Sequence, residues 1–256
     1  MNFIISATTD VGTTKQTNQD SLTVKTIRTC QGRMVLAVLC DGMGGLQKGE
    51  VASASVVRAF EQWMFEQLPQ LCAAGPIEDA AIRAQWTELV TAQNDAIRTY
   101  GAQQGIRLGT TVVAVLLTQS RFYAVNVGDS RLYELTGGIR CITKDQTVVA
   151  REVEQGFLTP EQARVDPRRN VLLQCVGASD TVVPDFFFGP TLENAVYLLC
   201  SDGFRHEISA EEIFGLLQPA ALLDSASMER SARALIDCDM QRGERDNISV
   251  ALVRTF

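Results

Sequence analysis

Residues 34–45 read Met34-Val35-Leu36-Ala37-Val38-Leu39-Cys40-Asp41-Gly42-Met43-Gly44-Gly45, an apolar run that ends in a carboxylate followed by glycines. The run is short and bounded by turn residues, which predicts a buried strand. An ionised carboxylate at the end of such a strand is costly to desolvate unless a cation, a metal or several hydrogen bonds accompany it. The glycines let the backbone turn tightly and bring its carbonyl groups close to a ligand. An Asp-Gly turn is equally typical of an ordinary hairpin, so Asp41 alone leaves both interpretations open.

The composition is that of a folded globular protein. The chain has 256 residues, 46% of them hydrophobic, which is enough to build a substantial core. No apolar run approaches the roughly 18–20 residues of a membrane span, and the first five residues lack the basic region of a secretory signal. We therefore expect a cytoplasmic protein with no membrane association.

Charge, cysteine and histidine content narrow the chemistry further. The net charge of −7 argues against general nucleic-acid binding, which favours a basic surface. The seven cysteines are an odd number without a C-x-x-C pair, so neither a disulfide framework nor a zinc site is predicted. His206 is the only histidine, which excludes a multi-histidine metal site. Hydrolytic chemistry would therefore depend more readily on carboxylates and hard metal ions.

The order of the expected elements predicts a layered α+β fold. Helical spacing of apolar residues indicates long helices at about 50–68 and 77–100, separated by residues 69–76, and another helix at about 228–242. Alternating or continuous apolar runs predict strands at 3–10, 21–28, 34–40, 110–118, 122–127, 132–135, 139–143, 182–188, 195–200 and 248–253. Strands and helices come in groups, which favours α+β layers over a parallel βαβ series. No linker divides the chain, so we expect one domain spanning residues 1–256.

Two further aspartates share the setting of Asp41. A second buried strand ends in Asp202-Gly203, and Asp246-Asn247 opens the last strand. If these strands lie in packed sheets, the three carboxylates can meet at one edge, where repulsion raises their pKa values unless a divalent cation neutralises them. Ligation by oxygen alone selects Mg²⁺ or Mn²⁺. Two ions bridged by one aspartate would polarise a water between them and hold a phosphoryl oxygen.

The ordered motifs of the chain resemble the metal-dependent protein Ser/Thr phosphatases, the type-2C-like family, in its bacterial form. They are Asn18-Gln19-Asp20, Asp41-Gly42-Met43-Gly44-Gly45 with Gly49-Glu50, Gly109-Thr110-Thr111, Val127-Gly128-Asp129-Ser130-Arg131, Thr143-Lys144-Asp145, Ser201-Asp202-Gly203 and Arg245-Asp246-Asn247. The resemblance implies a central sandwich of two antiparallel β-sheets flanked by helices on both sides, a four-layer α-β-β-α arrangement, with the metals at one end.

The resemblance also implies the roles of the principal aspartates, which would act in catalysis by holding two Mn²⁺ or Mg²⁺ ions. Asp41 resembles the carboxylate that bridges both ions, and the carbonyl of Gly42 resembles a ligand of one. Asp202 and Asp246 resemble ligands of the other ion.

Supporting residues follow from the same resemblance. Asp20 resembles a group that holds metal-bound waters, and Asn247 supports the site from behind the ligands. Asp129, together with Asp202, resembles the site of a possible third, weaker metal. The mixed and charged segment at about 144–180 occupies the position of a variable flap beside the active site.

Four positions depart from the family pattern. Lys15 stands where an arginine usually binds the substrate phosphate, so the charge remains but the two-pronged hydrogen bonding is lost. Met43 stands where animal members carry a histidine thought to protonate the leaving group, which leaves the general acid unassigned. Gln146 and Leu46 likewise replace histidines that are common in the family.

Several residues have simpler interpretations. His206 is expected at the surface or at a helix start rather than in the site. Cys40 and Cys200 are expected to point into the core, because side chains alternate along a strand. Lys15 could be a solvated loop lysine. The flap arginines Arg164, Arg168 and Arg169 could steer phosphoproteins or could simply be solvated.

The predicted function is hydrolysis of phosphoserine and phosphothreonine in proteins by a metal-bridging water. The expected partners are phosphorylated proteins, on which the enzyme acts in opposition to a Ser/Thr kinase. We expect the enzyme to be a monomer. One alternative keeps the site but acts on small phosphoesters. Another is a catalytically weak regulator that binds phosphoproteins on the same fold.

Overall fold

The computed structural model describes residues 1–43 and 48–256 of the chain. Most of the predicted elements are present within these residues. Gly44, Gly45 and Leu46, which belong to the predicted metal-binding turn, lie outside them.

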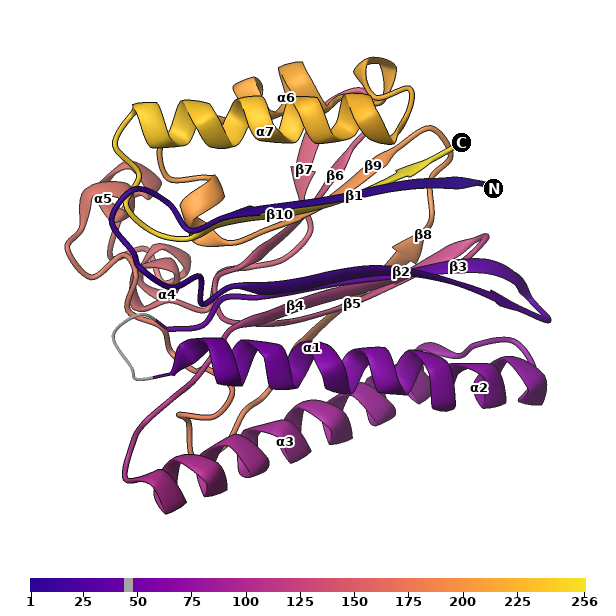
Figure 1. Ribbon diagram of the computed structural model, residues 1–256, viewed down its shortest axis with the longest axis horizontal. Coiled ribbons are helices and arrows are strands. Elements are labelled where there is room, and N and C mark those ends of the chain that lie inside the picture. The colour runs from indigo at the N-terminus through magenta and orange to yellow at the C-terminus, as the bar shows by residue number, and fades with distance from the viewer. Residues whose placement is uncertain (44–47) are drawn as a thin grey trace.

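Two five-stranded antiparallel sheets form the centre of the molecule (Figure 1). The first has the strand order β1-β10-β9-β6-β7 and consists of β1 (Phe3–Asp10), β10 (Ile248–Thr255), β9 (Val196–Cys200), β6 (Arg131–Leu135) and β7 (Ile139–Cys141). The second has the order β2-β3-β4-β5-β8 and consists of β2 (Ser21–Thr29), β3 (Gly32–Cys40), β4 (Val112–Leu117), β5 (Arg121–Val127) and β8 (Asp185–Pro190). Since β1 and β2 lie in different sheets, the loop between them crosses from one layer to the other.

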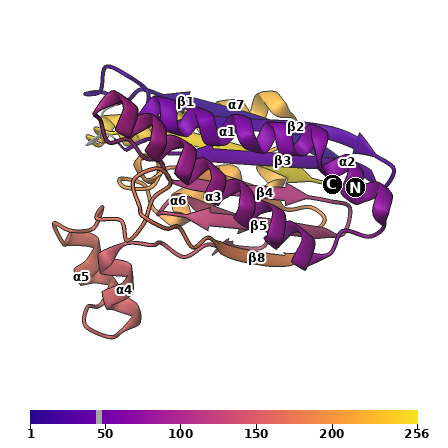
Figure 2. The same cartoon turned by 90° about the horizontal axis from the view of Figure 1, so that it is seen from below.

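Helices cover the outer face of each sheet, which confirms the four-layer α-β-β-α arrangement. The sheet that contains β3 is covered by α1 (Gly49–Glu66), α2 (Leu68–Ala74) and α3 (Asp79–Gln104), and the other sheet by α6 (Ala210–Leu217) and α7 (Ser225–Gln241) (Figure 1). Short 3₁₀ helices lie at η1 (Asp202–Phe204) and η2 (Pro219–Ala221). In the flap, α4 (Val148–Glu154) and α5 (Pro160–Val165) project from one end of the layers (Figure 2). The partly helical insertion predicted for residues 144–180 is therefore present.

The position of strand β3 explains why its residues from Met34 to Cys40 are all apolar. Leu36 and Val38 pack against the helix layer, whereas Ala37 and Leu39 pack between the sheets, and all four are fully buried. A strand that is central in its sheet and covered on both faces has no solvent side to make polar. In the helix layer, Trp86 packs edge-on against both Phe60 and Trp63. The prediction that Cys40 and Cys200 point into the core is also confirmed, since each is buried in one of the two cores between a sheet and its helices.

Two short helices were not predicted. Residues 69–76 were expected only to separate two helices, but most of them belong to α2, where Pro69 stands in the first turn and its missing N–H breaks no helical bond. Helix α6 begins after Ser209, whose side chain and that of Glu212 bond each other's backbone N–H groups in a capping box. Both helices are too short for apolar spacing to reveal them.

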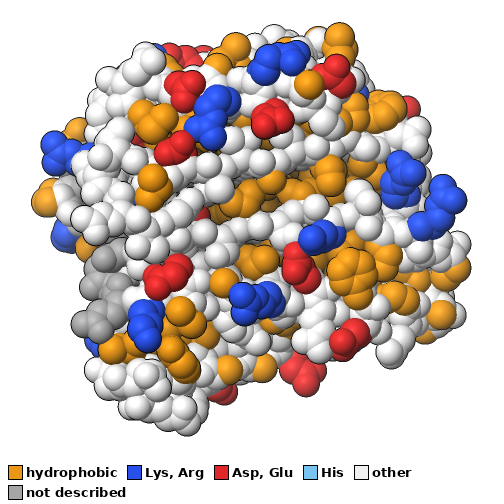
Figure 3. Space-filling view, viewed as in Figure 1, with side chains coloured by type: hydrophobic (Ala, Val, Ile, Leu, Met, Phe, Trp, Pro, Cys, Tyr) orange, Lys and Arg blue, Asp and Glu red, His pale blue; other side chains and the backbone are white. Residues whose placement is uncertain are grey.

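The surface seen from the β1 and β2 side mixes charges of both signs. Figure 3 shows Lys and Arg side chains interspersed with Asp and Glu over the helix layers, and apolar side chains between the two sheets. No helix within the described residues is both long enough and apolar enough to cross a membrane.

Candidate active site

Four chain segments meet at one end of the sandwich. The end of β3 lies beside the start of β2, since Cys40 pairs with Ser21, and the end of β9 lies beside the start of β10, since Cys200 pairs with Val250. Figure 1 shows these strand ends on the same side of the molecule as the flap. The residues just beyond the strands are Asp20, Asp41, Asp202 and Asp246. The topology thus gathers aspartates that are far apart in the sequence.

The backbone of Asp41 is fixed by the Gly109-Thr110-Thr111 motif. Its N–H donates to Thr111 Oγ1 at 3.0 Å, and its carbonyl accepts from the Thr110 hydroxyl and from the Thr111 N–H, each at 2.9 Å. Gly42 follows, and its N–H donates to the Gln19 carbonyl at 3.1 Å. A Cβ on Gly42 would lie 2.6 Å from the Gly49 carbonyl oxygen, so only glycine permits this close approach. These bonds set the direction of the turn that carries the predicted carbonyl ligand.

Asp202 and Asp246 are connected through the turns beside them. The Ser201 hydroxyl accepts from the Ser249 N–H at 3.0 Å, which joins the end of β9 to the start of β10. A Cβ on Gly203 would lie 2.3 Å from the Asn247 carbonyl oxygen, so these two turns also pack backbone against backbone. This contact holds Asp202 and Asp246 close to each other.

Asn247 holds the β1–β2 loop in place. Its Nδ2 donates to the carbonyls of Val11 at 2.9 Å and Thr17 at 3.3 Å, and its Oδ1 accepts from the Gln19 N–H at 2.9 Å. This loop carries Lys15 and ends at Asp20. Asn247 therefore supports the site by bonding backbone groups of the loop.

Electrostatics favour a cation at this end of the sandwich. Burial, followed by the charges of Asp20, Asp202, Asp129 and Asp246, raises the pKa of Asp41 well above its usual range. The carboxylates are therefore close enough to repel one another strongly.

The carboxylate of Asp20 is also placed unfavourably for a negative charge. Burial raises its pKa to about 7, and the hydroxyls of Ser249 and Ser201 offset part of this effect, although neither makes a hydrogen bond of standard geometry to it. Both carboxylate oxygens of Asp20 and Oδ1 of Asp202 are buried and have no hydrogen-bond partner within residues 1–43 and 48–256. Buried acceptors in this state are expected to take a cation or ordered water.

The carboxylate oxygens at this end of the sandwich are suitable ligands for hard divalent ions, although they are not arranged tightly enough to surround one. Within residues 1–43 and 48–256, no group of three or more His, Cys, Asp or Glu side chains is compact enough to hold a metal as it stands. One reason lies in Asp246, whose Oδ1 is 3.1 Å from Lys15 Nζ and also accepts from the Asn247 N–H at 2.8 Å. Asp246 would have to exchange its lysine partner for an ion. Oxygen ligands of this kind are those that Mg²⁺ and Mn²⁺ prefer.

His206 belongs to the site, so its predicted place at the surface or a helix start was wrong. Its Nε2 lies 3.5 Å from Asp202 Oδ2, and its Nδ1 lies 3.0 Å from Glu244 Oε2. Burial would lower the pKa of His206, but Glu244 and then Asp202 raise it above the usual value. The imidazole therefore lies between the carboxylates of Asp202 and Glu244. Sequence reasoning missed Glu244, whose only signal is its position two residues before Asp246.

A second set of ion pairs lies beside Asp129. Asp145 accepts two hydrogen bonds from Arg131, at 2.7 and 2.8 Å, and lies 3.4 Å from Nη2 of Arg205. The same Arg205 nitrogen donates to the carbonyl of Asp129 at 2.9 Å and lies 3.8 Å from its Oδ2. Arg205 was also missed, although it follows the Ser201-Asp202-Gly203 motif almost directly.

The flap is fastened to the sheets by Gln146, one of the residues that replace a family histidine. Its Oε1 accepts from the Gly128 N–H at 2.9 Å and from Gln174 Nε2 at 2.9 Å, and its Nε2 donates to Asp185 Oδ2 at 2.8 Å. The three flap arginines, Arg164, Arg168 and Arg169, are all exposed, and Arg168 pairs with Glu152 and Asp166. Arg168 thus braces the flap itself.

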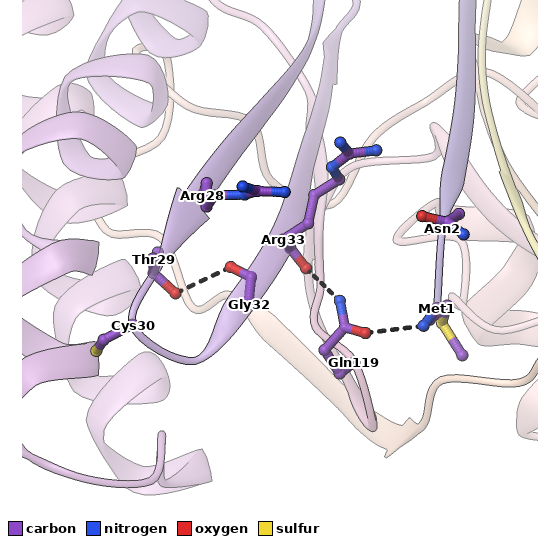
Figure 4. A pocket seen from close by; sticks show the side chains of 8 residues that line it. All are labelled: Met1, Asn2, Arg28, Thr29, Cys30, Gly32, Arg33 and Gln119. Carbon is purple, nitrogen blue, oxygen red and sulfur yellow. Dashed lines mark hydrogen bonds between the residues drawn. The ribbon is translucent and has the colours of Figure 1, made fainter.

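Two cavities lie away from these carboxylates. One, of about 430 Å³, is at the opposite end of the sandwich, where Arg28 and Arg33 of the β2–β3 hairpin face Asn2 and Gln119 (Figure 4). The other, of about 440 Å³, lies beside the end of α3 and is lined by Arg98 and Arg107. The candidate active site is therefore identified from the chemistry of its carboxylates.

Comparison with known proteins identifies relatives along nearly the whole chain. A family model described as Protein phosphatase 2C matches residues 12–238, which include Lys15, Asp41 and Asp202 but end before Asp246. A protein phosphatase 2C-type protein of Streptococcus pyogenes is 32% identical over 253 residues, covering 97% of this chain and 96% of the relative.

Solved structures agree with this match. Serine/threonine phosphatase Stp1 from Staphylococcus aureus superposes with a TM-score of 0.85 at 27% identity, over 100% of this chain and 96% of that one. The catalytic domain of the serine threonine protein phosphatase PstP in complex with 2 manganese ions superposes with a TM-score of 0.78 at 29% identity, over 99% of each chain. Since the family model covers most of the chain and a relative above 30% identity covers nearly all of it, the chain belongs to the protein phosphatase 2C family.

Proposed function

We propose that this protein removes phosphate from phosphoserine and phosphothreonine in proteins, using two Mn²⁺ or Mg²⁺ ions. The observation that carries the proposal is the convergence of three carboxylates, Asp20, Asp41 and Asp202. Oxygens of Asp20 and Asp202 are buried without a hydrogen-bond partner among the described residues, and burial and neighbouring aspartates raise the pKa values of Asp20 and Asp41. The relatives named as serine/threonine phosphatases, one of them solved with two manganese ions, support the substrate class and the metals.

The ligands proposed for the ions are those predicted from the sequence. Asp41 would bridge both ions, the Gly42 carbonyl would bind one, and Asp202 and Asp246 would bind the other. When bound, the ions supply a water acidified for attack on phosphorus and positive charge for the phosphoryl oxygens. Asp20, buried and without partners, orients water at the site, and Asn247 keeps the loop that carries Asp20 and Lys15 in place.

Lys15 is the proposed contact for the substrate phosphate. Its ammonium lies 3.1 Å from Asp246 Oδ1, so a positive charge stands at the rim of the carboxylate cluster. A phosphoryl group that approaches the cluster needs such a charge to offset repulsion from the aspartates. Lys15 binds it as a point charge, without the fixed two-pronged geometry of arginine.

We further propose that residues 1–256 act as one catalytic domain that opposes a Ser/Thr kinase and works as a monomer. The partners would be phosphorylated proteins. Support for a single domain comes from the apolar cores. One core lies between the two sheets and takes residues from both, and each sheet shares a further core with its helices.

The substrate class is tested by comparing a phosphothreonine peptide with a small aryl phosphate, both with Mn²⁺. The proposal predicts a kcat/KM at least about 10-fold higher for the peptide, because contacts with the chain around the phosphate add binding energy in the transition state. A higher kcat/KM for the aryl phosphate would point to a small-phosphoester hydrolase. Peptide binding without turnover would point to a regulator that binds phosphoproteins.

A further inference from the structure

The turn that carries Asp129 has a charged partner of its own. The resemblance described above places a possible third, weaker metal at Asp129 and Asp202. In the structure, the guanidinium of Arg205 occupies the space beside Asp129. Its Nη2 donates to the Asp129 carbonyl at 2.9 Å and lies 3.8 Å from Asp129 Oδ2, and both side chains are largely buried, at 14% and 7% exposure.

We propose that Arg205 takes the place of the third cation, so that this enzyme holds two metal ions and uses a side chain where a third ion would otherwise bind. The proposal rests on the proposed function and deepens it, because it assigns the charge balance of the same site. Arg205 is thereby a positioning residue for Asp129.

Arg205 has a second polar contact besides those with Asp129. Besides its bond to the Asp129 carbonyl, its Nη2 lies 3.4 Å from Asp145 Oδ2. Asp145 is in turn fixed by the two-pronged bond from Arg131. Because Arg205 is bonded to a backbone carbonyl and lies against a carboxylate that is itself anchored, an ion that displaced it would have to break both contacts.

A divalent ion at Asp129 would have to lie beside the guanidinium of Arg205, whose Nη2 is 3.8 Å from Asp129 Oδ2. Burial would raise the pKa of Asp145, but Arg205 and Arg131 bring it below the usual value. A divalent ion bound to Asp129 would lie within a few ångströms of the guanidinium, and like charges at that separation in a buried setting repel strongly. The residues present therefore do not fit a third ion.

The test counts bound Mn²⁺ by equilibrium dialysis of the full chain with the free ion measured by electron paramagnetic resonance. Arg205→Ser removes the guanidinium and leaves Asp129 and Asp145 facing the vacated space, so this variant is expected to bind one more ion than the unaltered protein. Arg205→Lys retains a positive charge and is expected to bind the same number as the unaltered protein. Adding Asp129→Asn to Arg205→Ser is expected to remove the extra ion.

The outcomes separate this inference from the proposed function. A third ion bound by the unaltered protein at millimolar Mn²⁺ would overturn the inference without any variant, even if Arg205→Ser fails to fold. An equal count for the unaltered protein and a folded Arg205→Ser, judged by circular dichroism, would also overturn it. A count below two in the unaltered protein would instead contradict the proposed function, while the difference between the two proteins would still decide the role of Arg205.

Discussion

Lys15 is the residue at which this chain departs most clearly from the expected phosphate-binding pattern. It stands at the rim of the aspartate cluster and contacts Asp246 at 3.1 Å. Replacing Lys15 with alanine should lower kcat/KM for a phosphothreonine peptide by roughly 10- to 100-fold, since a hydrogen bond to a charged group contributes about 1.5–3 kcal/mol. Most of the loss should be in KM, because a lysine that binds phosphate equally in substrate and transition state acts on binding.

Lys15→Arg is the matched control for that experiment. It keeps the charge and restores the two-pronged donor, so its kcat/KM should equal or exceed that of the unaltered protein. Steady-state kinetics on the two variants provide the measurement. Unchanged kinetics for Lys15→Ala would mean that Lys15 is only a solvated loop lysine.

Individual residues differ in how well the sequence could predict their roles. Asp41 and Asp202 were recognisable because each ends an apolar run, and a charge at that point needs an explanation. His206 and Arg205 gave no such signal, because their partners Glu244 and Asp145 are distant in the sequence and become neighbours only through the fold. Their contacts depend on how β9 and its 3₁₀ turn approach the flap and the start of β10.

Helix α7 contains a buried acid that the proposed reaction does not use. Asp239 is fully buried, and neither of its carboxylate oxygens has a hydrogen-bond partner in the described part of the chain. Burial, followed by the charge of Glu244, raises its pKa from 3.8 to about 8, although His206 partly offsets this. In the unfolded chain Asp239 loses its proton near its ordinary pKa of 3.8, whereas in the folded protein it keeps the proton up to about pH 8. Between about pH 4 and pH 8 the folded state therefore binds more protons, so Asp239 makes the protein less stable as the pH rises through that range.

Asp239→Asn should remove this part of the pH dependence. Relative to the unaltered protein, the variant should gain about 1–3 kcal/mol of unfolding free energy between pH 5 and pH 8.5, because an uncharged amide carries no ionisation penalty. Urea unfolding at the two pH values measures the change. The half-buried Asp237 on the same helix supplies the control, since Asp237→Asn should show no such gain. An equal pH dependence for Asp239→Asn and the unaltered protein would contradict the assignment.

The elements of the fold were predictable where the apolar pattern is long or continuous. Strand β3 and helices α1 and α3 were found close to their observed bounds because burial on two faces, or along one helical stripe, leaves a clear pattern. Helices α2 and α6 were missed because they depend on a proline in the first turn and on a capping box, which are local signals without a repeating stripe.

At the scale of the whole molecule, the pairing of distant strands creates the site. Strand β1 pairs with β10 from the other end of the chain, whereas its sequence neighbour β2 pairs with β3 in the opposite sheet. Periodicity cannot reveal such partners, so the two-sheet arrangement was predictable only through the family resemblance. The same arrangement brings Asp41 at the end of β3 opposite Asp202 at the end of β9. The catalytic account therefore depends on the sandwich as a unit.

The most direct test of this account measures phosphate release from a phosphothreonine peptide after treatment with EDTA and after addition of Mn²⁺. The unaltered protein and Asp95→Asn, which alters an exposed residue on α3, should be inactive in EDTA and regain full activity with Mn²⁺. Asp41→Asn should remain at least about 10³-fold less active with Mn²⁺, because it loses the proposed bridging carboxylate. Activity that persists in EDTA, or that survives in Asp41→Asn, would contradict the two-metal mechanism.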